Sequence, residues 1–376
     1  MSLTPDIEQC FHRDWSAANR AFLDCCARHG LAVKHYPHPI VGPDGEALET
    51  VAAWGGPEKA KRLLVLVSGT HGLEGLAGSG CQIHWIEGGG IAALPPGTAV
   101  LLIHIINPWG CAWSRRQTED NVDLNRNFCD FSQSLPRNAH YEELHQALVM
   151  RDRAAGAPAV AAFQASHSEA EFATALFKGQ YAHPDGVGFG GQAPTWSNRT
   201  LRQILDDHCA GIEGAVAIDF HTGLGDYGSG LILSIAMPDS VSSRMAAEVF
   251  GDELIRVNAS DSSLPYKVQG DICSAIEDRF GGSTLAITLE FGTFTVGDLL
   301  GLQIEDCWLY NHGDAASPEG QRIRTALRHF FYPDEAAWRQ HIVARAEFVI
   351  RKSLVRLASS KRRSVARSVD RRAGRH

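Results

Sequence analysis

Three apolar runs constrain the fold more than any other feature of this sequence. They are RLLVLVSGT at 62–70, AVAIDF at 215–220 and LAITLEF at 285–291. Apolar runs without polar alternation are typical of strands that are buried on both faces, as in parallel sheets covered by helices. Because helical patterns alternate with such runs along the chain, we predict an α/β fold. We expect a single domain with a mixed, mostly parallel central sheet flanked by helices.

Weaker patterns predict the remaining elements. Short extended segments are expected at 31–36 and 50–55, and a further buried strand, AVLLIHIIN, at 99–107. Apolar positions at helical spacing predict helices over about 139–154 and 158–178. In a sheet of this kind, ligand sites lie beyond the carboxyl ends of the strands.

Charge is divided unevenly along the chain. Residues 351–376 contain ten basic residues and one acidic residue, for a net charge of +9, whereas the rest of the chain carries −17. We expect residues 1–350 to form the catalytic domain, closed by an amphipathic helix at about 335–357, and 351–376 to be a basic, partly disordered tail. An acidic body is not typical of nucleic-acid-binding domains, so no nucleic acid partner is expected, although the tail leaves an anionic partner open.

The cysteines and the apolar runs indicate the compartment. There are nine cysteines, an odd number, and none forms a Cys-x-x-Cys pair, which indicates free thiols in a reducing environment. The first residues, MSLTPDIEQCFHRDW, lack the apolar segment of a secretory signal, and no apolar run approaches 18 residues. We therefore expect a cytoplasmic protein without a membrane span.

Metal-ligating side chains follow the predicted buried strands. His71 and Glu74 come directly after the first of them, His221 follows the second, and Glu290 ends the third. A catalytic zinc ion takes imidazole and carboxylate ligands from three residues and keeps one position open for water. These side chains therefore predict a catalytic zinc site at the carboxyl edge of the sheet.

Five motifs follow one another along the chain: GTHGLEG at 69–75, NPWG at 107–110, NVDLNRNF at 121–128, DFHTG at 219–223 and TLEFG at 288–292. In this order they resemble the zinc carboxypeptidase superfamily, which includes the aspartoacylases and succinylglutamate desuccinylases. Within it, the chain looks most similar to a bacterial branch known only as a domain of unknown function, which has an EFGT box followed by an aromatic-rich helix.

The resemblance implies a zinc carboxypeptidase-like fold and a set of roles at the metal. His71, Glu74 and His221 would be the ligands of a Zn²⁺ ion. Glu290 would be the general base, which takes a proton from the attacking water and returns it to the leaving amine. Asp219 would lie near the last ligand, and its own partner is left open.

The resemblance also implies how the substrate is held. Asn125 and Arg126 match the clamp for the substrate carboxylate, to which a guanidinium binds through two parallel hydrogen bonds. Arg116, with Arg115 as the alternative, matches the arginine that stabilises the oxyanion. Asp123 would support the arginine loop.

The expected activity is zinc-dependent hydrolysis of an amide bond next to a free carboxylate. The leading version is a carboxypeptidase-like metallopeptidase that acts on small peptides. The alternatives are an N-acyl-amino-acid deacylase and a zinc-binding fold without turnover. Digestive carboxypeptidases place a mobile tyrosine over the substrate, and Tyr266 and Tyr310 remain open as candidates for that position.

Overall fold

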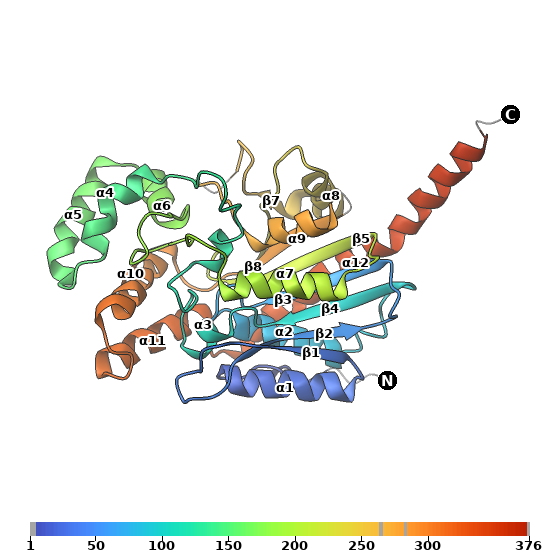
Figure 1. The fold of residues 1–376 in the computed structure, drawn as a ribbon, viewed down its shortest axis with the longest axis horizontal. Helices are drawn as coiled ribbons and strands as arrows, with labels where there is room; N and C mark the ends of the chain where they lie inside the picture. Colours follow the sequence, from blue (N-terminus) through green and yellow to red (C-terminus); the bar gives the residue numbers. More distant parts are fainter. Residues whose placement is uncertain (1–4, 263–265, 282–283, 374–376) are drawn as a thin grey trace.

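An eight-stranded sheet runs through the centre of the protein, in the order β1-β2-β4-β3-β5-β8-β6-β7 (Figure 1). The computed structural model describes residues 5–262, 266–281 and 284–373. The neighbours β4, β3, β5 and β8 are parallel, whereas β1, β2 and β6 are each joined to the sheet by antiparallel pairing. The predicted mixed, mostly parallel sheet is confirmed. Its strands are β1 (Ala32–Pro37), β2 (Glu49–Gly55), β3 (Arg62–Ser68), β4 (Thr98–His104), β5 (Gly214–Thr222), β6 (Gly230–Ser234), β7 (Leu254–Arg256) and β8 (Thr284–Phe291).

Both faces of the sheet are covered by helices, as the apolar runs predict. In β3, Leu64 and Leu66 pack into one apolar cluster, and Leu63 and Val65 into another on the opposite face, because side chains alternate along a strand. The first face is covered by α1 (Trp15–Arg28), α2 (Gly75–Glu87), α8 (Val241–Phe250) and α12 (Ala336–Ala373), and the second by α7 (Trp196–His208) and α9 (Ile272–Phe280). The short helices are η1 (Ile7–Gln9), α3 (Pro108–Ala112), η2 (Leu124–Arg126) and η3 (Gly251–Glu253).

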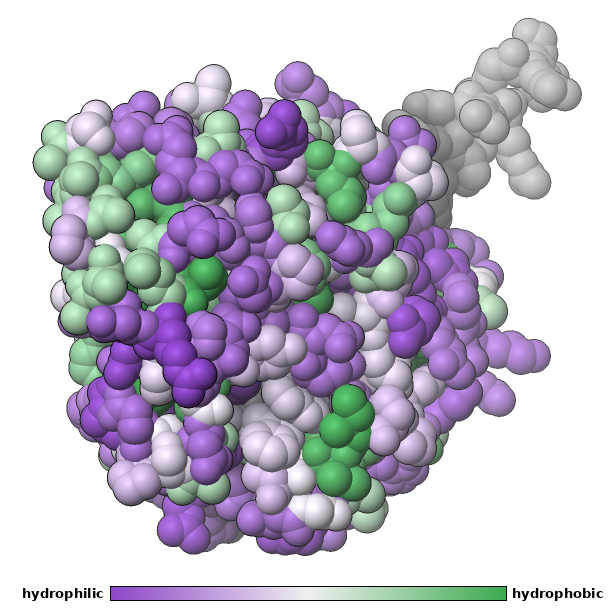
Figure 2. Space-filling view, turned by 60° about the vertical axis from the view of Figure 1, so that its left-hand side comes forward, coloured by the Kyte–Doolittle hydropathy of each residue, from purple (hydrophilic) through white to green (hydrophobic). Residues whose placement is uncertain are grey.

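A helical lobe lies beside the sheet and has a small apolar core of its own (Figure 1). It contains α4 (Ala139–Leu148), α5 (Arg153–Ser166) and α6 (Glu169–Phe177), which pack with α10 (Val296–His312), while α11 (Pro318–Phe331) follows α10. Figure 2 is turned toward the side of this lobe, where hydrophilic residues cover most of the surface and weakly hydrophobic residues gather at the upper left of the view.

The lobe corrects two of the expected helices. The pattern predicts helices over about 139–154 and 158–178, but the structure has three helices there, with breaks after Leu148 and Ser166. Two caps explain the breaks, because Asp152 accepts a hydrogen bond from the backbone of Ala154, and Ser168 forms a capping box with Glu171. Capping side chains start new helices inside a stretch whose composition alone favours continuous helix.

The last helix is longer than expected. Trp338, which is fully buried, anchors α12 by donating from its indole nitrogen to the carbonyl oxygen of Gly292 at 2.9 Å. From there α12 continues to Ala373 and projects from the body (Figure 1), so the expected boundary at residue 350 falls inside a helix.

No helix in the described part of the chain combines the length and the apolar composition that crossing a bilayer requires. β7 was not expected, since a strand of three residues carries almost no pattern.

A half-buried glutamate in α9 predicts how stability depends on pH. Ser242 donates a hydrogen bond to Glu277, and burial raises the pKa of Glu277 to about 7. The folded state therefore binds this proton more tightly than the unfolded chain does, and the free energy of unfolding decreases as pH rises from about 4.5 to 7.

We expect the Glu277→Gln variant to lose this pH dependence. Urea unfolding of both proteins at pH 5 and pH 8 should show that the wild type loses on the order of 1–2 kcal/mol more than the variant between the two pH values. Equal losses would contradict the assigned shift.

Candidate metal centre

Three strand ends bring the candidate ligands to one edge of the sheet. His71 lies three residues beyond the end of β3, and His221 is the second-to-last residue of β5. In β8, Glu290 is the register partner of His221. The carboxyl ends of parallel strands meet at the same edge, which explains why residues far apart in sequence share one site.

Three buried residues bring their ligand atoms together at this edge. The Nδ1 atoms of His71 and His221 are 3.1 Å apart, and Glu74 places its Oε1 3.0 Å from the first and its Oε2 3.2 Å from the second. Ligands about 2.0–2.1 Å from a tetrahedral zinc ion stand roughly 3.3 Å apart. These three residues could therefore hold a metal ion with little rearrangement.

Two further carboxylates fix the orientation of the imidazole rings. Asp219 contacts Nε2 of His221, and Asp123 Oδ1 lies 3.0 Å from Nε2 of His71. Because a carboxylate accepts hydrogen bonds, each Nε2 carries a hydrogen, and in the neutral ring Nδ1 is the atom that can offer its lone pair to the shared point. Thr70 in turn donates to the other oxygen of Asp219 at 2.8 Å. This arrangement answers the question that the sequence left open for Asp219.

The charges of the group also fit a bound cation. With both rings neutral, the two Nδ1 lone pairs face each other across 3.1 Å, and Glu74 adds a negative charge beside them. The carboxylates of Asp219 and Glu74 raise the pKa of His221 well above its ordinary value despite burial, while His71 and His221 lower that of Glu74. The cluster therefore attracts positive charge, either a proton or a divalent metal ion.

A close approach of two backbones holds the turn that carries His71 and Glu74. A Cβ atom on Gly72 would stand 2.3 Å from the backbone of Gly110, so only glycine fits there. The same turn donates from the backbone of Gly72 to the carbonyl oxygen of Arg116 at 3.1 Å. The GTHGLEG and NPWG motifs thus pack against each other and place Arg116 next to the ligands.

Asp123 connects the metal centre to the arginine loop. Its side chain caps the short helix η2 by accepting from the backbone of Asn125 at 3.0 Å. It also accepts from Arg116 Nη1 at 2.7 Å while it contacts His71. Arg116, and then His71, lower the pKa of Asp123 well below its ordinary value against the effect of burial, so this carboxylate stays ionised. Support of the arginine loop was expected of Asp123, but its contact with His71 was not.

The two adjacent arginines point to different places. Arg115 forms a bidentate ion pair with Asp306 of α10, with N–O distances of 2.8 and 3.0 Å, and its guanidinium stacks on Tyr310. Arg116 instead lies 3.5 Å from Glu74 and faces the metal centre. Of the two candidates, Arg116 is therefore the one beside the ligands, and Arg115 ties the loop to the lobe.

A cavity of about 210 Å³ opens onto the ligands. Most of its wall is apolar, with polar groups converging at one end, which is typical of small-molecule sites. Tyr266 contributes to the wall, whereas Tyr310 is held away by its stacking on Arg115. The described residues that line the cavity are His71, Glu74, Arg116, Arg126, Ala173, Phe177, Thr222, Gly223, Leu224, Tyr266, Glu290, Leu299, Gln303 and Phe331.

The two expected clamp residues are placed differently. Arg126 lines the cavity, and three of its N–H groups donate to the carbonyl oxygens of Asn125, Phe177 and Lys178 at 2.6–3.2 Å. A guanidinium has five such groups, so two remain for a ligand. Asn125 is not among the described residues of the cavity wall, and its side-chain oxygen accepts from the backbone of Ile272 at 3.0 Å.

Some partners of the site could not be found from the sequence. The backbone of Thr222 donates to Glu74 Oε2 at 3.0 Å, and Gln303 reaches the cavity from α10. No motif contains Gln303, because it enters from a helix about 230 residues after His71 along the chain. Thr222 lies within the DFHTG motif, so the sequence indicates its position near His221 but not its hydrogen bond to Glu74.

Comparison with known proteins gives a family but no curated relative. The family described as "Protein of unknown function (DUF2817)" matches residues 11–345, and no curated protein matches the chain. Among solved structures, the chain resembles bovine thrombin-activatable fibrinolysis inhibitor in complex with tick carboxypeptidase inhibitor (11% identity, TM-score 0.44, 90% of this chain and 100% of that one). It also resembles the carboxypeptidase A from Helicoverpa armigera (12%, 0.44, 87% and 75%) and the succinylglutamate desuccinylase from Chromobacterium violaceum (14%, 0.37, 84% and 74%). Because their TM-scores lie below 0.5, these similarities say nothing about the function of this chain.

Replacing Asp219 with asparagine tests the orientation of His221. The variant keeps the oxygen that accepts from Thr70 and places an NH₂ group against His221 Nε2. The hydrogen of His221 then moves to Nδ1, where it blocks the metal. We expect zinc affinity, measured by competition with a chelating dye, to fall about 10–100-fold.

Asp207→Asn is the matched control, because Asp207 pairs with Lys34 on the surface and makes no contact with the site. Unchanged zinc affinity in Asp219→Asn would rule out the assigned role.

Proposed function

We propose that this chain, which belongs to the DUF2817 family, is a zinc-dependent hydrolase that cleaves an amide bond next to a free carboxylate. One observation carries the proposal. The buried group His71, Glu74 and His221 opens into a cavity whose wall also contains a half-buried carboxylate, Glu290, and two arginines. A general base and cations for a carboxylate and an oxyanion are what amide hydrolysis at a metal requires.

His71, Glu74 and His221 would hold the metal ion. When bound by two imidazoles and a carboxylate, zinc polarises a carbonyl group and lowers the pKa of a coordinated water to about 7. Asp219 and Asp123 keep both imidazoles in the tautomer that offers Nδ1. The cysteines Cys81 and Cys111, near the same motifs, have raised thiol pKa values because they are buried, so they do not compete as nucleophiles.

Glu290 serves as the general base in this proposal. It lies beside His221 at the end of β8, and burial raises its pKa to about 8. A carboxylate with a pKa near the working pH accepts a proton from the attacking water more readily than an exposed glutamate does. Glu290 then delivers that proton to the nitrogen of the leaving amine as the amide C–N bond breaks.

Arg116 and Arg126 each stabilise a different negative charge of the substrate. Arg116, next to Glu74 and Asp123, stabilises the oxygen that becomes negative when water adds to the carbonyl. Arg126 has two unused N–H groups, enough to bind a carboxylate in a bidentate pair. Asn125, one residue earlier, is proposed to assist from behind the cavity wall, because its hydrogen bond from the backbone of Ile272 holds the short helix η2 that carries Arg126.

The cavity walls favour a small substrate with an apolar side chain. Phe177, Leu224, Leu299 and Phe331 contribute apolar surface near the polar groups. The volume of about 210 Å³ is small compared with drug-sized pockets of roughly 300–1,000 Å³. A dipeptide, or an amino acid with a short acyl group, fits this description better than a long peptide does.

Glu290→Gln tests the general base. We expect kcat to fall about 10²–10⁴-fold while zinc stoichiometry stays unchanged, because glutamine retains the shape and cannot accept the proton. Hydrolysis of the best dipeptide is followed by amine release, and metal content is measured on the same samples. As a control, Glu277→Gln changes a half-buried glutamate of α9 outside the cavity and should retain full activity. Equal activity of the Glu290→Gln variant and the wild type would contradict the role of Glu290 as base.

Arg126→Gln tests recognition of the free carboxylate. We expect KM to rise about 10–100-fold for a substrate with a free carboxyl terminus, since a charge-assisted bidentate pair is lost. For the carboxamide analogue of the same substrate, the wild type and the variant should differ little. Equal effects on both substrates would assign Arg126 to structure alone.

A substrate panel separates the peptidase from the N-acyl-amino-acid deacylase. Dipeptides, N-acyl-amino acids and muropeptides are incubated with the zinc-loaded protein, and released amino acids are quantified. Release from dipeptides supports the peptidase, and release from N-acyl substrates alone supports the deacylase. A protein that binds zinc but hydrolyses no member of the panel would support the version without turnover.

A further inference from the structure

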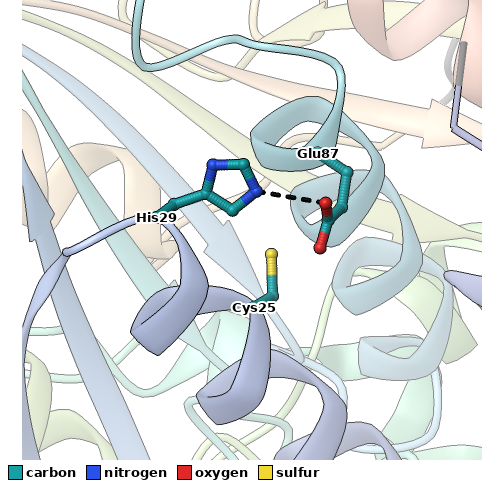
Figure 3. A group of neighbouring side chains, drawn as sticks. All are labelled: Cys25, His29 and Glu87. Atoms are coloured by element: carbon teal, nitrogen blue, oxygen red, sulfur yellow. Dashed lines mark hydrogen bonds and ion pairs between the residues drawn. The ribbon is translucent and has the colours of Figure 1, made fainter. Parts of the chain in front are cut away.

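A second cluster of metal-ligating side chains lies between α1 and α2, away from the catalytic cavity. It contains Cys25, His29 and Glu87, and each offers one ligand atom within 4.8 Å of the others. In Figure 3 the sulfur of Cys25 points toward the space between the ring of His29 and the carboxylate of Glu87. None of these residues takes part in the hydrolysis proposed above.

The geometry of the cluster follows from the two helices. Cys25 lies in the last turn of α1 and His29 is its C-cap, so the spacing of four residues puts both side chains on one face. Glu87 is the last residue of α2, and its Oε2 lies 3.1 Å from Nε2 of His29. Cys25 is fully buried, whereas the side chains of His29 and Glu87 are 30% and 27% exposed, so the cluster is open to solvent on the side of these two residues.

Glu87 carries the negative charge of the cluster in the metal-free protein. Hydrogen bonds from Arg28 and then His29 lower the pKa of Glu87 to about 2, although partial burial acts in the opposite direction, so the carboxylate is ionised at neutral pH. Burial and the charge of Glu87 raise the pKa of the Cys25 thiol. In the metal-free protein Cys25 therefore carries its proton, and Arg28 balances Glu87 through Oε1 at 2.5 Å.

We propose that Cys25, His29 and Glu87 form a second site, for a divalent cation of the zinc class, that fastens α1 to α2. A set of one thiolate, one imidazole and one carboxylate suits zinc or cobalt(II) and leaves the fourth tetrahedral position to water. As the sulfur–metal bond forms, the proton of the Cys25 thiol passes to solvent, and no oxidation is involved. Glu87 exchanges Arg28 for the metal ion.

The position of the site suggests a structural role. Helix α2 is flanked by Glu74 as its N-cap and ends at Glu87, so one helix connects the two candidate centres. Helices α1 and α2 pack against each other, and an ion bound at their ends would restrain α2 relative to α1. Because Glu74 belongs to the catalytic group, the second site would help to position a ligand of the first.

Cobalt(II) distinguishes the two sites by spectroscopy. The catalytic group offers only nitrogen and oxygen, so a near-ultraviolet thiolate-to-cobalt charge-transfer band reports the second site alone. When Co²⁺ is titrated into metal-free protein, we expect this band to saturate once one equivalent has bound in addition to the equivalent that fills the catalytic group. Cys25→Ala should abolish the band, and the neighbouring buried Cys26→Ala should retain it, which controls for lost packing.

Two further variants test the other ligands. His29→Ala and Glu87→Gln should each weaken Co²⁺ binding at this site at least about tenfold. Arg28→Gln should strengthen it several-fold, because the competing partner of Glu87 is removed. A wild-type protein without the band, or a band that survives in Cys25→Ala, would overturn the proposal and leave the cluster as an ion pair between α1 and α2. Neither result affects the proposed hydrolysis, since catalytic zinc is measured independently by activity.

Discussion

Two contacts between a carboxylate and an imidazole determine the properties of the candidate metal centre. Asp219 holds His221, and Asp123 holds His71, each through Nε2. Both Nδ1 atoms therefore face the same point, together with the carboxylate of Glu74. Without these contacts, either ring could turn or take the other tautomer, and its Nδ1 lone pair would no longer point toward the position shared with Glu74. The close approach of the Gly72 turn to Gly110 and the short helix η2 serve to keep these contacts in place.

The arginines connect this centre to the helical lobe. Arg115 is paired with Asp306 of α10, whereas Arg126 donates to the carbonyl oxygens of Phe177 and Lys178 at the end of α6. The lobe therefore supplies part of the cavity wall and also holds the two loops that carry the polar groups. Burial of each guanidinium costs less because three of its five N–H groups donate to fixed acceptors. Movement of the lobe would change the position of Arg126, the proposed carboxylate anchor, before it changed the ligands.

The sequence predicts the sheet well because a strand covered on both faces is apolar at nearly every position, and this pattern is visible in the sequence. The runs that contain β3, β5 and β8 have the composition of strands covered on both faces, and the structure confirms this. The sequence also indicates His71, Glu74, His221 and Glu290, since each follows such a strand. The family resemblance favours Arg116 and keeps Arg115 as the alternative. The sequence alone does not show where Arg115 points, because that depends on Asp306, which is distant in the chain. The breaks between the lobe helices, set by single caps, were missed for a similar reason.

The central claim concerns the position of one metal ion, and anomalous diffraction from zinc-soaked crystals tests it most directly. A peak at the zinc absorption edge should lie about 2.0–2.1 Å from Nδ1 of His71 and of His221, and within bonding distance of the Glu74 carboxylate. Crystals of the His71→Ala/His221→Ala variant provide the control and should lack that peak. A fully zinc-soaked wild-type crystal without a peak between these three residues would contradict the account of the site and the mechanism that rests on it.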